Sequence, residues 1–146
     1  MTDPELAEDI RAKLEEAFPE ADVRRSAQSI VPVAVIELSG ATGDWKPLIL
    51  VYPASGSSES REARGRTATL DHAVNVLVAG KVNGTDVEES DPLEALTERV
   101  REFLRGNDVP PAKWLRATAF VPQIPGVLVY LNGMTEQYRS IWMAVR

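Results

Sequence analysis

The sequence predicts an α+β protein: a single domain, residues 1–146, in which two main helices pack on a mixed or mostly antiparallel β-sheet and a long mobile loop joins two strands. Three observations support this prediction. Apolar residues recur with helical spacing near residues 3–18 and 91–106, whereas the other apolar segments have the pattern of strands. Strands and helices do not alternate regularly, as they would in a parallel βαβ fold. No repeat or linker divides the chain.

The first helix is expected over residues 3–18. Pro4 suits the first turn, acidic residues lie near the positive end of the helix dipole, and Pro19 ends the helix. The apolar side chains share one face: Leu6, Ile10, Leu14, Ala17 and Phe18. We interpret this helix as a cover for the sheet rather than as a partner-binding helix, because most helices owe their stability to tertiary packing.

The middle of the chain is expected to form three strands and a loop. Two strands cover residues 30–38 and 47–52, and the second ends at Pro53. A long mobile loop, rich in serine and arginine, then runs from Ala54 to Gly65. The third strand, residues 66–82, is long enough to project beyond a small core. Its alternation predicts one solvent-exposed face and one apolar face, which carries Leu70, His72, Val74, Val76 and Val78.

The last third of the chain is expected to form a helix and three strands. Asp91 can cap the helix, Pro92 fits its first position, and Gly106 ends it just after Leu104. The strands cover residues 114–120, 127–131 and 137–145. Because Asn132–Gly133 favours a tight turn, we expect the last two strands to form a hairpin.

The composition excludes several classes of function. The 146 residues carry a net charge of −6, one histidine and no cysteine. Disulfides, thiolate nucleophiles and sulfur-based metal centres are therefore excluded, and a lone His72 excludes a His–His metal pair within one subunit. The acidic charge argues against a broad nucleic-acid-binding face. No apolar run is long enough to span a membrane and no leader is evident, so we expect no membrane partner.

No motif points to catalysis. His72 could act as a general base beside Asp71 or Asp91, but its position on the apolar strand face favours a hydrogen-bonded structural histidine. The acidic segment from Asp86 to Asp91 lacks the calcium-loop pattern. We therefore expect no enzymatic activity, no catalytic residue, no cofactor and no metal.

Interfaces are the remaining place for candidate functional residues. Arg61, Arg64 and Arg66 lie in or beside the predicted loop, where arginine can pair with a neighbour's carboxylates or with phosphate. The alternative is a loop kept soluble by its charge. We favour the interface, because an acidic protein that self-assembles needs positive patches. Tyr138 and Trp142 could anchor an interface, with core packing as the alternative for each.

The order of features along nearly the whole chain is also informative. The sequence has an N-terminal helix, an arginine-bearing loop between two strands, a second capped helix and terminal strands. The motifs at these places are Val51-Tyr52-Pro53, Asp71 to Lys81, Asp91-Pro92-Leu93, Trp114, Gln137-Tyr138-Arg139-Ser140-Ile141 and Val145-Arg146. In this order the chain resembles the tail terminator proteins of long-tailed bacteriophages, also called tail completion or tail-to-head joining proteins.

The resemblance implies a structural protein of the virion. Such a subunit forms a homo-oligomer, a hexameric ring, that caps the finished tail tube, stops its polymerisation and joins the tail to the head. Its partners are copies of itself, the tail-tube protein and a head-completion or neck protein, and DNA passes through the ring only in transit. Within this interpretation, Arg61, Arg64, Arg66, Tyr138 and Trp142 lie at subunit or tail-tube interfaces, and the 54–65 loop becomes ordered on docking.

Other interpretations remain open. Head-closure and tail-tube subunits have similar size and charge and belong to the same assembly, in a phage, a prophage or a gene transfer agent. A small non-viral binding module that holds a peptide at its loop and sheet edge is a further alternative. A small enzyme would depend on a pocket that joins His72 to a second ionisable group.

Overall fold

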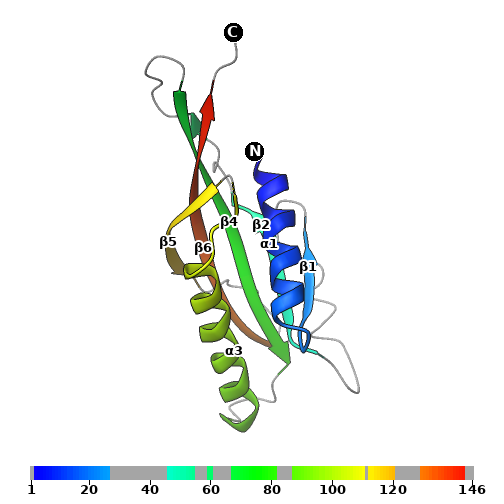
Figure 1. Cartoon of the computed structure of the whole chain (residues 1–146). Helices are drawn as coiled ribbons and strands as arrows, with labels where there is room; N and C mark the ends of the chain where they lie inside the picture. Colours follow the sequence, from blue (N-terminus) through cyan, green and yellow to red (C-terminus); the bar gives the residue numbers. More distant parts are fainter. Residues whose placement is uncertain are drawn as a thin grey trace.

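A computed structural model describes residues 2–26, 46–54, 59–60, 67–81, 87–110, 112–120 and 129–143. These residues form two helices and a six-stranded sheet, which confirms the α+β class (Figure 1). In chain order the elements are α1 (Asp3–Ala17), β1 (Asp22–Arg25), β2 (Leu48–Pro53), β3 (Glu59–Ser60), β4 (Thr67–Lys81), α3 (Val87–Arg105), β5 (Ala112–Phe120) and β6 (Val129–Met143).

The sheet is mixed. Its strands lie in the order β1-β2-β4-β6-β5, and β3 pairs with β4 outside this path. β1 runs parallel to β2, whereas all other pairs are antiparallel. β4 and β6 pair over their full length, from Thr67 opposite Met143 to Lys81 opposite Val129. The Thr67–Met143 end of this pair extends past α1, so the long strand projects as predicted (Figure 1).

Both helices pack on one face of the sheet. The main core joins α1 and α3 to alternate residues of the strands and consists of Leu6, Ile10, Leu14, Phe18, Ile49, Val51, Val74, Val76, Val78, Leu96, Val100, Leu104, Met134 and Tyr138, with smaller residues between them. The two helices also meet each other, because the rings of Phe18 and Phe103 pack edge to face at 5.7 Å. The predicted role of α1 as a cover for the sheet agrees with this arrangement.

A second, smaller core lies on the opposite face and corrects the prediction that this face of β4 is entirely solvent-exposed. Leu77 and Ala79 are completely buried and cluster with Leu48 and Leu50. These residues are cross-strand neighbours, because Leu50 lies opposite Leu77 and Leu48 lies opposite Ala79, so their side chains pack together. Further towards the start of β4 the same face carries the partly buried polar residues Asn75 and Asp71.

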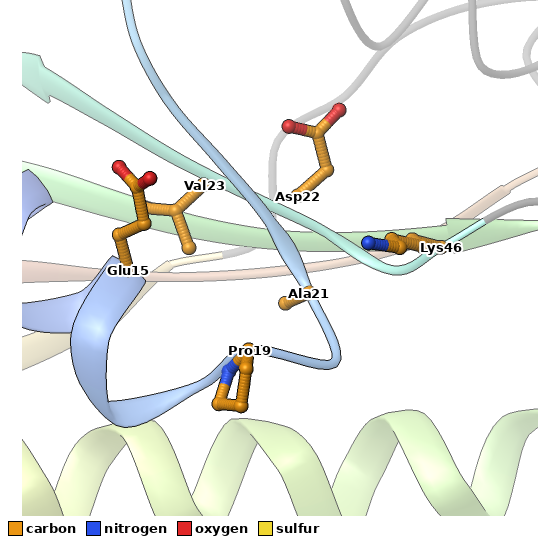
Figure 2. A pocket seen from close by; sticks show the side chains of 6 residues that line it. All are labelled: Glu15, Pro19, Ala21, Asp22, Val23 and Lys46. Carbon is orange, nitrogen blue, oxygen red and sulfur yellow. The ribbon is translucent and has the colours of Figure 1, made fainter.

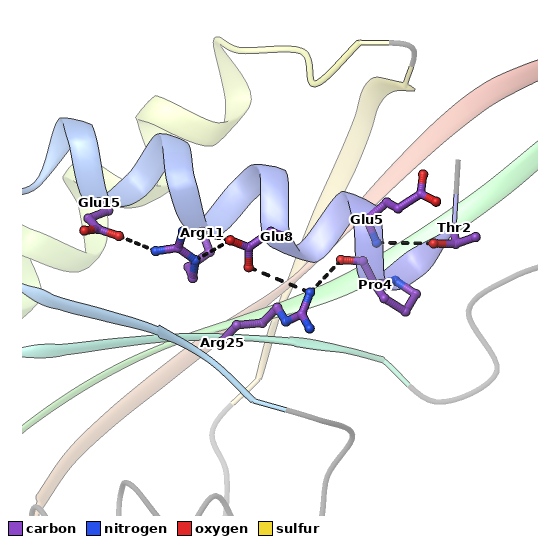
Figure 3. Close-up of polar contacts among 7 residues, drawn as sticks. All are labelled: Thr2, Pro4, Glu5, Glu8, Arg11, Glu15 and Arg25. Atoms are coloured by element: carbon purple, nitrogen blue, oxygen red, sulfur yellow. Dashed lines mark hydrogen bonds and ion pairs between the residues drawn. The ribbon is translucent and has the colours of Figure 1, made fainter.

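Polar contacts fix the position of α1 against β1 (Figure 3). The backbone N–H of Glu5 donates to the hydroxyl of Thr2, which caps the helix. Arg25 of β1 donates to the carbonyl oxygen of Pro4 at 3.1 Å and pairs with Glu8 at 3.7 Å. Arg11 bridges Glu8 and Glu15 along the exposed side of the helix. Arg25 on β1 therefore has its polar partners within the chain.

The predicted hairpin at Asn132–Gly133 is wrong, because β6 runs without interruption from Val129 to Met143. Gly133 pairs with Leu77 in mid-strand, and a Cβ at this position would lie 2.5 Å from the ring of Phe120. The glycine therefore serves close side-chain packing and not a turn.

The second helix begins earlier than predicted. α3 starts at Val87, so Asp91 is an exposed helical residue and Pro92 lies in the second turn. Pro92 has no N–H to donate to the carbonyl four residues earlier, so the helix continues through this position without that hydrogen bond. The end agrees with the prediction: the N–H of Gly106 donates to Glu102, and the side chain of Asn107 donates to Phe103.

Two short strands were not predicted. β1 was missed because its four residues, Asp22–Arg25, contain a single apolar side chain. β3 interrupts the predicted 54–65 loop, most of which is outside the described residues. The predicted strand over residues 30–38 also falls outside them.

Candidate functional site

The structure places two of the five residues predicted at interfaces. Arg61, Arg64 and Arg66 lie outside the described residues. Trp142 belongs to β6, opposite Ala68, and its side chain is not described. Tyr138 is completely buried in the main core. In this conformation Tyr138 therefore stabilises its own chain and offers no surface to a neighbour.

His72 has the hydrogen-bonded, interior position that the sequence predicts. Its Nε2 lies 2.8 Å from the hydroxyl of Ser140 across the β4–β6 pair. Asp71, one of the carboxylates considered as its partner, lies on the opposite face of β4 and pairs with Arg139. A histidine and a hydroxyl at this distance have the spacing of a base and a nucleophile. Both side chains are at most 3% exposed, however, so the pair joins two strands and does not form an open catalytic site.

A cluster of buried polar groups lies next to this pair, under α3. Within the described part of the chain, the carboxylate oxygens of Glu136, the indole nitrogen of Trp114 and the hydroxyl of Tyr138 have no hydrogen-bond partner. Burial raises the pKa of Glu136 to about 7. The Trp114 indole, close by but outside hydrogen-bonding geometry, and the positive charges of Arg101 and Arg105 oppose this rise without cancelling it. Glu136 is thus a described acidic residue whose pKa lies near neutral pH, so its charge changes there.

The hydroxyl of Tyr138 is affected in the same direction. Burial raises its pKa, and the negative charges of Glu136 and Asp108 raise it further. The hydroxyl is therefore neutral at neutral pH. This cluster is a group of enclosed polar atoms that the fold tolerates at a cost in stability.

A row of charges crosses the other face of the sheet near its projecting end. We call it the charged row: Lys113, Arg139 and Asp71, which lie opposite one another in successive strands β5, β6 and β4. Arg139 donates to Asp71 through two nitrogens, at 2.7 and 3.4 Å, and this contact raises the pKa of the Arg139 guanidinium. Lys113 is exposed and makes no ion pair with a described residue. The row is thus positive on β5 and β6 and negative on β4.

β5 is an edge strand with an exposed outer side. No described strand pairs with it beyond β6, and every residue from Leu115 to Ala119 is exposed. At the start of the strand, Asp108 accepts from the backbone N–H of Trp114, and Val109 and Ala112 bond to each other. A bulge then follows between Trp114 and Arg116. The outer side is therefore capped at its beginning and open afterwards.

A hollow of about 560 Å³ lies where α1 ends, between β1 and the residues before β2 (Figure 2). Its charged lining residues are Glu15, Asp22 and Lys46. Glu15 already pairs with Arg11, and Asp22 pairs with Arg24 at 2.7 Å. Because both carboxylates have partners in the chain, the hollow does not bring free polar groups together for a ligand.

Within the described ranges, no group of three or more acidic or histidine side chains could hold a metal ion. No helix among the same residues is long and apolar enough to cross a membrane.

Comparison with protein-family models and with curated protein sequences finds no match for this chain. The class of protein is defined by its fold, by the projecting β4–β6 pair and by the edge strand β5. It is an α+β subunit with helices on one face of a mixed sheet.

Three features of this region were missed from the sequence. Glu136 fell between two predicted strands and was not considered, although its alternation with Met134 and Tyr138 is the signal that could have placed it in a core-facing strand. Ser140 had no signal of its own. The charged row depends on the register between strands distant in sequence, which no local pattern reveals.

Proposed function

We propose that this chain is a structural assembly protein of a phage-type tail, whose copies form a ring that caps the tail tube, ends its polymerisation and offers a surface for joining the head. Its partners would be other copies of the chain, the tail-tube protein and a head-completion or neck protein. Its place would be the head–tail junction of the virion, and a negatively charged ring would let DNA pass without holding it.

One observation supports this proposal: the described part of the sheet ends at β5, an exposed edge to which a strand of another chain could add. The β4–β6 pair extends past the helix layer, and β5 leaves its outer side exposed from Leu115 to Ala119. Open strand edges are usually protected or completed by a partner. Closed rings arise when one surface of a subunit repeatedly meets a different surface of the next.

The buried state of His72 and Ser140 supports an assembly role over an enzymatic one. A general base must reach its substrate within hydrogen-bonding distance. Both groups are enclosed by the main core, so substrate access would require the strands to separate. A head-closure or tail-tube subunit would share these features, and the choice among them rests on where the protein binds.

The test measures the mass of the purified oligomer and its location on isolated tail tubes. The purified chain should form a closed oligomer by light scattering, and electron microscopy should show it at one end of isolated tail tubes. A chain that remains monomeric even with tail tubes present would contradict the proposal. Binding all along the tubes would indicate a tube subunit instead.

A further inference from the structure

Glu136 is a buried carboxyl group beside a cation that is paired elsewhere. Its side chain faces the core from β6 and is completely buried, and its two oxygens have no hydrogen-bond partner among the described residues. Met134 lies two residues earlier on the same face of the strand and accepts a contact from Arg101 of α3, whose Nε is 3.2 Å from the Met134 sulfur. Such alternate residues are about 7 Å apart along a strand, so rotation of the Arg101 side chain brings its guanidinium to the carboxyl group.

The present partner of Arg101 is easily exchanged. Arg101 donates to Glu98 at 2.8 Å, one turn earlier on α3, and the Glu98 side chain is 57% exposed. An exposed ion pair of this kind contributes little to stability, whereas a buried carboxylate without a partner is costly. Because the Arg101 side chain is itself only 26% exposed, an inward rotation removes little further water from it.

The groups that surround Glu136 come from several elements. They are Arg101 and Arg105 of α3, Asp108 after it, Trp114 of β5, Tyr138 of β6 and, opposite Tyr138, His72 of β4. Burial raises the pKa of Glu136 to about 7, and the charges of Arg101 and Arg105 act against this rise. Of these two cations, Arg101 already touches β6, whereas Arg105 is an exposed residue at the end of the helix.

We propose that Arg101 is a two-position switch, which pairs with Glu98 while Glu136 carries a proton and with Glu136 once that proton has passed to the solvent. In the second position an ion pair joins α3 to β6, and the carboxylate of Glu98 is released on the exposed side of α3. Ionisation of a buried group thereby changes the charge pattern at the surface. The inference is independent of the proposed ring.

Crystal structures of the full chain at two pH values test the exchange directly. At about pH 5 the guanidinium of Arg101 should lie against Glu98, and at about pH 9 it should lie against Glu136. In Glu136→Gln, the control, it should stay with Glu98 at both pH values. An Arg101 side chain that stays with Glu98 in the wild type at both pH values overturns the switch.

Titration of the Glu136 carboxyl carbon by NMR tests the competition between the two carboxylates. Arg101→Gln should raise the pKa of Glu136 by about one pH unit, because the partner of the ionised form is lost. Glu98→Gln should lower this pKa, because Arg101 is then free for Glu136. In the Arg101→Gln background, Glu98→Gln should leave the pKa nearly unchanged. An equal effect of Glu98→Gln in both backgrounds would mean that Glu98 acts through space and would overturn the competition.

Two variants on the same helix are controls. Arg99 pairs with Glu20 at 2.9 Å and is not among the charges that act on the buried carboxyl group, so Arg99→Gln should leave its pKa unchanged. Arg105→Gln should raise the pKa less than Arg101→Gln does, and an equal or larger rise overturns the assignment to Arg101. Thermal unfolding checks that each variant is folded. If Arg101→Gln does not fold, Glu98→Gln decides, since an unchanged or higher pKa in that variant contradicts the switch.

Discussion

Leu93 of α3 fills the space above Gly80 of β4. A Cβ at residue 80 would lie 2.4 Å from both terminal methyl groups of Leu93, which is itself 2% exposed. The glycine thus lets the start of α3 lie close to the end of the longest strand pair. This contact positions α3 over the buried cluster that contains Glu136.

The first prediction concerns this contact. Gly80→Ala should lower the free energy of unfolding by about 1–3 kcal/mol, because Leu93 is enclosed and must move. Chemical denaturation measures the change. Gly106→Ala is the matched control, since the nearest atom to its Cβ would be a backbone oxygen at 3.5 Å, and it should change stability by less than about 0.5 kcal/mol. Equal effects at the two glycines would show that the Leu93 contact is unimportant.

Glu136 makes stability depend on pH. Its folded-state pKa of about 7 is above the ordinary value of 4.5, so the folded chain binds a proton between these two values that the unfolded chain has released. Stability from this group is therefore greatest below about pH 4.5, falls as the pH rises towards about 7, and is constant above it. The full difference is about 3 kcal/mol.

The second prediction follows from this sign. Glu136→Gln should be more stable than the wild type by about 1–3 kcal/mol at about pH 8, and equally stable at about pH 3.5, below the unfolded-state pKa, because glutamine resembles the protonated acid. Denaturation curves of both proteins across this pH range measure the difference in their free energies of unfolding. The other titrating groups are the same in both proteins, so their contributions cancel. A difference independent of pH would mean that Glu136 does not titrate there.

The third prediction concerns the hydrogen bond between His72 and Ser140. Ser140→Ala should destabilise the fold by about 1–2 kcal/mol, because a buried ring nitrogen loses this partner. Thr118→Ala, on the exposed part of β5, serves as the control and should have little effect. Any activity assigned to the chain should survive His72→Gln when folding is preserved. Loss of activity at unchanged stability would restore the enzyme hypothesis.

The fourth prediction comes from the sequence alone. Replacing Arg61, Arg64 and Arg66 together by glutamate should weaken assembly more than folding, since a charged, serine-rich segment contributes little to the core. The two effects are measured separately, by sedimentation and by thermal unfolding. Unchanged assembly would remove these arginines from the interface.

The sequence predicted those elements whose signals are local. α1 and the end of α3 follow from apolar periodicity and stop residues, and β4 follows from a long run of alternating residues. Local signals failed where tertiary contacts decide the structure. Asn132–Gly133 has the chemistry of a turn, but the ring of Phe120 occupies the space beside Gly133 and β6 continues.

The candidate site was harder to predict for the same reason. Lys113, Asp71 and Arg139 are unremarkable in sequence and acquire meaning only through the register of β5, β6 and β4. Tyr138 was predicted at an interface because its aromatic type fits one, whereas its strand faces the core. Residue type alone cannot separate these two environments.

The most direct test of the central claim is the mass of the wild-type chain in solution, measured by light scattering with and without isolated tail tubes. The proposed function predicts a discrete closed oligomer, a hexamer by the family resemblance, found at one end of each tube. A monomer under both conditions would contradict it.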